Sequence, residues 1–68
     1  MNKKQIFIDR VKKQTNIELK EENFFLTKKR NILYTEVKSA DKIKLLSFLD
    51  KHNIRHEEHI GNFYFIWV

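Results

Sequence analysis

Gly61-Asn62-Phe63-Tyr64-Phe65-Ile66-Trp67-Val68 is the stretch of sequence that decides the fold. A Gly-Asn pair between two extended runs is typical of a two-residue hairpin loop, because Gly accepts the positive φ that such turns need. The six apolar or aromatic residues that follow are too few to span a membrane, and they make both faces of a strand apolar. A strand of this kind needs neighbours on both sides. Residues 63–68 therefore predict the central strand of a sheet.

Residues 54–60 predict the other strand of this hairpin. With a two-residue loop, Ile60 pairs with Phe63, and this pairing assigns every side chain to one of two faces. The face with more apolar bulk is expected to be the core, covered by helices. The expected core face carries Ile54, His56, Glu58, Ile60, Phe63, Phe65 and Trp67, and the opposite face carries Arg55, Glu57, His59, Tyr64, Ile66 and Val68.

Two helices and another hairpin are predicted upstream. Residues 3–15 are predicted to be helical, with Phe7, Ile8 and Val11 forming an apolar stripe. Residues 40–52 predict a second helix, with Ser39 as its N-cap and Asn53 in the left-handed position after its end. Between the helices, residues 24–28 and 32–38 predict two strands joined by a turn. The connection between the first helix and these strands is expected to tuck two apolar side chains, Ile17 and Leu19, under the sheet.

The predicted order of elements is αββαββ, in a single domain that spans residues 1–68. Two helices on one face of a four-stranded antiparallel or mixed sheet make a two-layer α+β sandwich. With the last strand in the centre, beside the second strand, the sheet order is 3-4-2-1. This arrangement resembles a ferredoxin-like fold whose first strand has moved to the C-terminus, a likeness of fold that implies no function.

Composition limits the class of protein. The chain has no cysteine and no signal-peptide pattern, so we expect a soluble cytoplasmic protein. Residue types with AT-rich codons (Lys, Asn, Ile, Phe, Tyr and Met) make up 34 of the 68 residues, which predicts a low-GC bacterium, or a phage or mobile element that lives in one. The net charge of +5 is uneven, because residues 1–30 carry nine Lys/Arg and four acidic residues, whereas residues 31–68 carry five of each.

The side of the sheet without helices is the first candidate site. Large exposed apolar patches on small proteins usually mark an interaction surface or a dimer interface. The alternatives are that residues 16–23 cover this side or that the two faces are exchanged. In the first hairpin, a turn at residues 28–31 pairs Leu26 with Leu33 and Phe24 with Thr35, so these four share the core face and their neighbours share the other. Together with the register of the second hairpin, the predicted partner-binding face consists of Phe25, Ile32, Tyr34, Tyr64, Ile66 and Val68.

Clustered cations form the second candidate site. A first helix that runs antiparallel to the first strand would bring its N-terminus to the tip of the first hairpin. Such a basic pole would attract phosphates or a carboxylate-rich protein surface. The alternative is an ordinary solvated surface in a lysine-rich proteome. The predicted basic pole consists of Lys3, Lys4, Lys28, Lys29 and Arg30.

Catalysis, cofactors and metals are not predicted. His52, His56 and His59 have a spacing that suggests metal ligands, but Asn53 breaks the helix, and His56 and His59 point to opposite faces of a strand. Neither Ser39 nor Ser47 has a histidine at a suitable position for nucleophilic catalysis. One glycine cannot make a Gly-rich phosphate loop. We therefore expect no enzyme activity, no cofactor and no metal.

Three functions remain as hypotheses. The leading one is a small non-enzymatic binding protein, a phage or mobile-element regulator or inhibitor that docks on a host protein or on a nucleoprotein complex of defence or nucleic-acid handling. It would act in the host cytoplasm, away from the membrane. The second is a direct RNA- or single-stranded-DNA-binding module, in which Tyr34, Tyr64 and Phe25 stack on bases beside Lys38 and Arg55. The third is a homodimeric structural protein.

Overall fold

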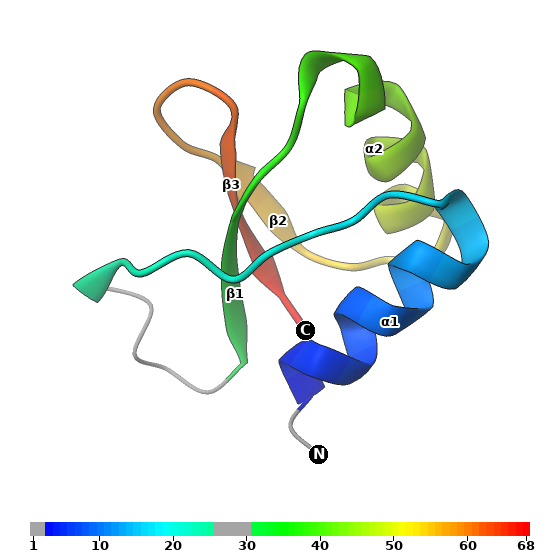
Figure 1. Cartoon of the computed structure of the whole chain (residues 1–68), viewed down its shortest axis with the longest axis horizontal. Coiled ribbons are helices and arrows are strands. Elements are labelled where there is room, and N and C mark those ends of the chain that lie inside the picture. Colours follow the sequence, from blue (N-terminus) through cyan, green and yellow to red (C-terminus); the bar gives the residue numbers. More distant parts are fainter. Residues whose placement is uncertain (1–2, 26–30) are drawn as a thin grey trace.

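Two helices pack on one side of an antiparallel sheet in the computed structural model, which describes residues 3–25 and 31–68 (Figure 1). Among these residues the sheet has three strands, in the order β1-β3-β2. The protein is thus a small, compact α+β structure. In chain order its elements are helix α1 (Lys3–Thr15), strand β1 (Ile32–Glu36), the 3-10 helix η2 (Ser39–Asp41), helix α2 (Lys42–Lys51), strand β2 (His56–Glu58) and strand β3 (Phe63–Trp67).

Both predicted helices are present. Helix α1 has the predicted bounds, and it ends at Asn16, which adopts a left-handed φ of 62° while its N–H donates to the Lys12 carbonyl. Helix α2 is shorter than predicted, because residues 39–41 form a 3-10 turn and no side chain caps the helix. It ends at Asn53, with a φ of 54°, and the Ile54 N–H donates to the Leu49 carbonyl. The prediction for Asn53 is confirmed.

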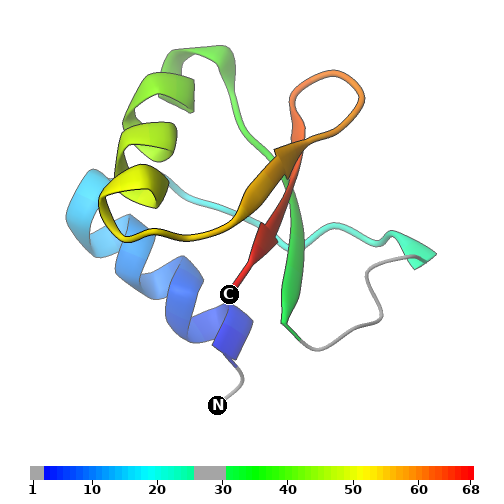
Figure 2. The ribbon, with the colours of Figure 1, turned by 180° about the vertical axis from the view of Figure 1, so that it is seen from behind.

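Strand β3 occupies the centre of the sheet, as its sequence predicts. It pairs antiparallel with β1, where Leu33 lies opposite Ile66, and with β2, where Glu57 lies opposite Phe65. Figure 2 shows the same sheet from behind, with α1 and α2 together on one side of it. The predicted position of the last strand between the two others is confirmed.

The predicted fourth strand is not present in the described part of the chain. There the sheet has three strands rather than four, and Phe24 and Phe25 lie outside it; the rest of the 24–28 prediction falls on residues that the structure does not describe. The chain does reach the free edge of β1, where the Glu22 N–H donates to the Tyr34 carbonyl over 2.7 Å. The Phe24 ring then packs across the sheet against Tyr34 and Phe65. Phe24 thus covers a face of the sheet, and residues 3–25 and 31–68 form a three-stranded sheet in place of the predicted four-stranded ferredoxin-like one.

The predicted register of the β2–β3 hairpin is wrong by one residue. The His59 N–H donates to the Phe63 carbonyl over 2.7 Å, and Glu58 lies opposite Tyr64, so the loop contains residues 60–62 instead of only Gly61 and Asn62. Gly61 supplies the expected positive φ, at 68°. A shift of one residue sends every side chain of a strand to the other face. The two faces of β3 are therefore exchanged relative to the prediction.

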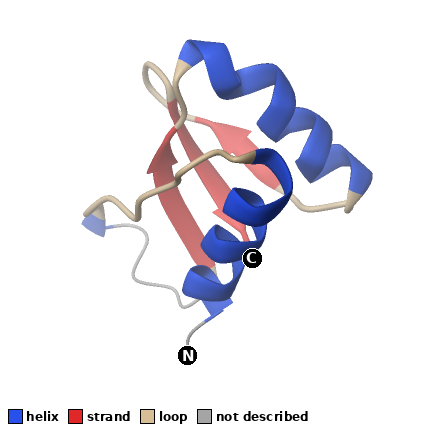
Figure 3. Ribbon diagram, turned by 45° about the vertical axis from the view of Figure 1, so that its right-hand side comes forward, coloured by secondary structure: helices blue, strands red, loops and turns tan. Residues whose placement is uncertain are grey.

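The hydrophobic core lies between the helices and the sheet. Leu33 and Ile66 are fully buried there against Val11 of α1 and Leu49 of α2. In Figure 3 the segment after α1 runs from the helix past the strands. This segment contributes Ile17 and Leu19 to the core, as predicted. In the described part of the chain, neither helix is long and apolar enough to cross a bilayer.

Candidate functional site

The six residues of the predicted partner-binding face are divided between the two sides of the sheet. Ile32 and Tyr34 lie on the outer side, away from the helices, as the predicted alternation of β1 requires. Phe25 lies there too, because it stacks on Phe24, which packs on Tyr34. Tyr64 and Ile66 lie in the core with at most 4% of their surface exposed, and Val68 packs against the same core. The prediction that Tyr64, Ile66 and Val68 face outward is wrong, because the hairpin loop is one residue longer.

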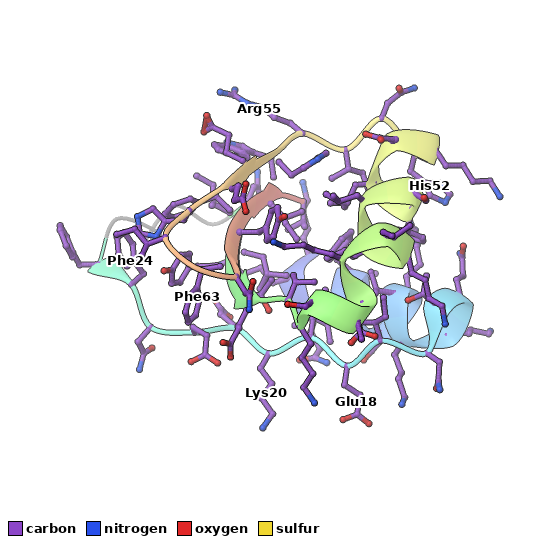
Figure 4. All side chains as sticks on the ribbon, turned by 90° about the horizontal axis from the view of Figure 1, so that it is seen from above. Glu18, Lys20, Phe24, His52, Arg55 and Phe63 are labelled. Carbon is purple, nitrogen blue, oxygen red and sulfur yellow. The ribbon has the colours of Figure 1, made fainter. Side chains whose placement is uncertain are left out.

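The outer side carries a cluster of aromatic rings in place of those residues. Tyr34 lies at its centre, with its ring stacked on Phe63 (centroids 5.1 Å apart, planes at 10°) and 4.8 Å from Phe65. The Phe24 ring packs on the Tyr34 ring, with centroids 4.7 Å apart. These contacts leave Tyr34 buried, whereas Phe24, Phe63 and Phe65 remain partly exposed. Figure 4 shows Phe24 and Phe63 on the side away from α2.

A hydrogen bond ties the cluster together across the sheet. The Tyr34 hydroxyl lies 3.0 Å from His59 Nδ1, which joins β1 to the end of β2 across the central strand. The His59 ring also meets Phe24 and Phe65 edge to face. Because aromatic pairs of this kind add about 0.5–1.5 kcal/mol beyond area burial, the cluster is an ordered surface.

Arg55 and Trp67 extend the cluster toward the end of β3. The Arg55 guanidinium lies over the Trp67 ring, 4.4 Å from its centroid, in a cation–π contact. Glu57 lies opposite Phe65, and Glu36 lies opposite Phe63, so both belong to this side of the sheet. The border of the cluster therefore carries charges of both signs.

Phe25 is the most exposed member of this surface. Its ring stacks on Phe24 with centroids 5.4 Å apart, yet 72% of Phe25 remains accessible to solvent. We use the name aromatic face for Phe24, Phe25, Tyr34, Phe63, Phe65 and Trp67, with His59 and Arg55 at its border. The sequence did not predict that four members of this face point away from the helices, namely Phe24, Phe63, Phe65 and Trp67. The Gly61 position alone could not reveal them, because it suits loops of two or three residues.

The predicted basic pole remains a prediction. Lys28, Lys29 and Arg30 lie outside the described residues. Lys3 is exposed, whereas Lys4 forms an ion pair with Glu21 at 2.5 Å and only 13% of its side chain is accessible. Of the two described residues of the pole, Lys3 has no ion pair with a described residue.

The three histidines have separate environments. His52 packs on Phe48 of α2, His56 Nδ1 lies 2.9 Å from the Ile54 carbonyl oxygen, and His59 contacts the aromatic face. Within residues 3–25 and 31–68, no group of three or more His, Asp or Glu side chains is arranged to hold a metal ion.

A cavity of about 530 Å³ lies where the segment after α1 passes the end of β1 and η2. Cations and carboxylates alternate around it, and Lys12 donates to Glu18 over 3.0 Å. This hydrogen bond, with the positive charges of Lys12, Lys20 and Lys38, lowers the pKa of Glu18 below that of an ordinary glutamate. Figure 4 shows Glu18 and Lys20 on the outside of this segment. The mixed charges favour no one class of ligand.

Comparisons of the chain with protein-family models, with curated proteins and with solved structures found no match.

Proposed function

We propose that this is a non-enzymatic binding protein that docks onto a partner protein through its aromatic face. The observation that carries the proposal is the position of this face: it lies on the side of the sheet opposite the helices, outside the hydrophobic core. Phe25 is 72% exposed, and Phe63, Phe65 and Trp67 are partly exposed. An apolar surface of this kind on a small protein usually marks a site of interaction.

The chemistry of the face favours a protein partner. Interface centres are rich in aromatic residues and arginine, and Trp, Tyr and Arg dominate binding energies. Trp67 and Arg55 are already held together by their cation–π contact, so docking would lose little side-chain freedom. The cluster of Tyr34, Phe63 and Phe65 offers a rigid surface of the same kind.

The charges at the border argue against direct nucleic-acid binding. A single-stranded nucleic acid needs a positive groove for its phosphates as well as stacking platforms for its bases. Among the described residues of this side, Arg55 is accompanied by two carboxylates, Glu36 and Glu57. Aromatic residues with charges of both signs around them match a protein interface better. The regulator or inhibitor role predicted from the sequence would make the partner a host protein or a nucleoprotein complex.

Site-specific photo-crosslinking tests the proposal. A photo-reactive phenylalanine analogue replaces Phe25, which is exposed, and in a matched control it replaces Lys20, an exposed residue of the segment after α1. Each protein is irradiated in the lysate of a low-GC bacterium. We expect a discrete adduct from position 25 only. The adduct should resist nuclease, and Trp67→Ala should reduce its yield about tenfold, as for a binding hot spot.

Three results would contradict the proposal. Equal labelling from positions 25 and 20 would mean that the aromatic face has no specific partner. A nuclease-sensitive adduct would instead support binding of RNA or single-stranded DNA. An adduct with twice the mass of the chain would support the homodimer.

A further inference from the structure

The whole net charge of the protein resides on its helical layer. Residues 3–15 and 39–51 carry eight Lys/Arg and three Asp, a net charge of +5, whereas the remaining residues carry six basic and six acidic groups. A lysine-rich genome would raise the number of lysines everywhere. It does not explain why acidic residues balance them outside the helices but not on them, so the helical layer has a distinct electrostatic character.

Most of the cations on this layer have no ion-pair partner among residues 3–25 and 31–68. Three lysines form ion pairs with carboxylates of other segments: Lys4 with Glu21, Lys12 with Glu18 and Lys42 with Glu58. The other five have no ion pair with any described residue, and they are Lys3, Arg10, Lys13, Lys44 and Lys51. Their charges remain available to a partner.

A groove of about 450 Å³ lies between the end of α1 and the outer side of α2. Lys44, Ser47 and Lys51 of α2 line it at i, i+3 and i+7 spacing, and none of its lining residues is acidic. Gln14 lines it from α1, and Arg10 lies one turn earlier on the same face of that helix. This volume falls in the range of about 300–1,000 Å³ that is typical of ligand sites.

The groove also has an apolar component. Phe48 is buried at its base, where it packs against Phe7, and Ile43 on its border is 81% exposed. Phosphates of a nucleic-acid backbone would pair with the lysines but would leave Ile43 in water. A peptide that combines carboxylates with an apolar side chain would satisfy both features.

We propose that the groove between α1 and α2 binds an acidic segment of a partner protein, with Lys44 and Lys51 pairing to its carboxylates and Ile43 contacting its apolar residue. This site lies on the layer opposite the aromatic face and goes beyond the function proposed above. The protein then has two independent docking surfaces, one on each side.

Amide chemical shifts of the labelled protein test this inference with a defined probe, the capped peptide Glu-Glu-Leu-Leu-Glu-Glu. A peptide with lysine in place of each glutamate is the matched probe. We expect the acidic peptide to shift the resonances of Ile43, Lys44, Ser47 and Lys51, and the basic peptide to shift none of them. Raising the salt concentration should weaken binding of the acidic peptide.

Variants at exposed positions separate the contributions of the lysines and of Ile43 to peptide binding. Lys44→Glu/Lys51→Glu should weaken binding about tenfold or more, since two attractive pairs become repulsive. The control variant Lys20→Glu/Lys38→Glu changes the net charge by the same amount at residues outside the groove. It should bind the acidic peptide nearly as well as the parent protein does. Ile43→Ser should weaken binding of the peptide several-fold.

Other outcomes would overturn the inference. One is an acidic peptide that shifts no resonance of the groove. Another is equal weakening of peptide binding by the two double variants. A 12-base-pair DNA duplex that binds the same residues more tightly than the peptide, with no effect of Ile43→Ser, would assign the groove to nucleic acid instead.

Discussion

Adjacent residues of β3 serve opposite sides of the molecule. Ile66 is fully buried between the sheet and the helices, opposite Leu33 of β1. Phe65 and Trp67, on either side of it, point away from the helices, where Phe65 contacts Tyr34 and Trp67 contacts Arg55. The strand is apolar on both faces for two reasons: one face forms the core and the other forms the aromatic face.

Ile60 and Ile66 test this assignment. A two-residue loop would bury Ile60 and expose Ile66, whereas the observed loop exposes Ile60 and buries Ile66. Ile66→Ala should lower the free energy of unfolding by about 2–5 kcal/mol, as expected for a buried side chain that leaves a cavity. Ile60→Ala is the matched control; Ile60 is 79% exposed in the hairpin loop, so the change should stay within about 0.5 kcal/mol. Urea denaturation measures both values. A larger loss of unfolding free energy for Ile60→Ala than for Ile66→Ala would support the two-residue loop instead.

The ion pair of Lys12 with Glu18 predicts a pH effect at one residue. The pKa of Glu18 is lowered, so the pair contributes stability above the ordinary pKa of glutamate, and this contribution is lost as the pH falls through the lowered value. Both side chains are largely exposed, so the effect on stability is small and screened by salt. Carbon-detected NMR titration should give Glu18 a pKa below that of an ordinary glutamate. Lys12→Ala should raise it; an unchanged pKa would contradict the assigned cause.

At the scale of elements, the hairpin loop decides which face of β3 is buried. Gly61 has a φ of 68°, which a residue with a side chain adopts at a cost. A Cβ at this position would meet no atom within 4 Å, so the cost of a substitution comes from the backbone alone.

Gly61→Ala should therefore destabilise the protein by about 1 kcal/mol, and Gly61→Asn by less, because Asn tolerates left-handed φ better than Ala does. Thermal unfolding followed by circular dichroism compares the two variants. A Gly61→Ala protein more stable than the parent would mean that the loop does not need a positive φ here.

Local patterns predicted the elements well but could not determine every contact between them. The stripe of Phe7, Ile8 and Val11 predicted α1, and Asn53 correctly marked the end of α2, because such signals depend on a few neighbouring residues. The register of β3 was not predictable in this way. A strand that is apolar on both faces has no hydrophobic pattern to choose between registers.

Phe24 shows a second limit of local patterns. Its aromatic side chain favours a strand, yet its ring packs across the sheet on Tyr34 and Phe65. The side of the sheet on which Ile32 and Tyr34 lie was predictable from the turn before β1, because that turn sets which residues share a face with Leu33 and Thr35.

At the scale of the whole molecule, the two layers present different chemistries. The helical layer carries the entire net charge of +5, and the opposite side carries the aromatic face with a mixed-charge border. If both proposed sites bind, the protein would contact two partner surfaces at once without competition between them. A regulator that holds two parts of a host complex together, or blocks one part from both sides, would have this design.

Trp67, the chain's one tryptophan, offers the most direct test of the docking proposal, because it lies on the aromatic face. The measurement is acrylamide quenching of its fluorescence as the purified partner identified by crosslinking is added. We expect efficient quenching in the free protein and a progressive loss of quenching that saturates with the partner, since docking would remove Trp67 from solvent. Quenching that stays constant while the partner binds would show that the partner docks elsewhere, and the aromatic face would not be the binding site.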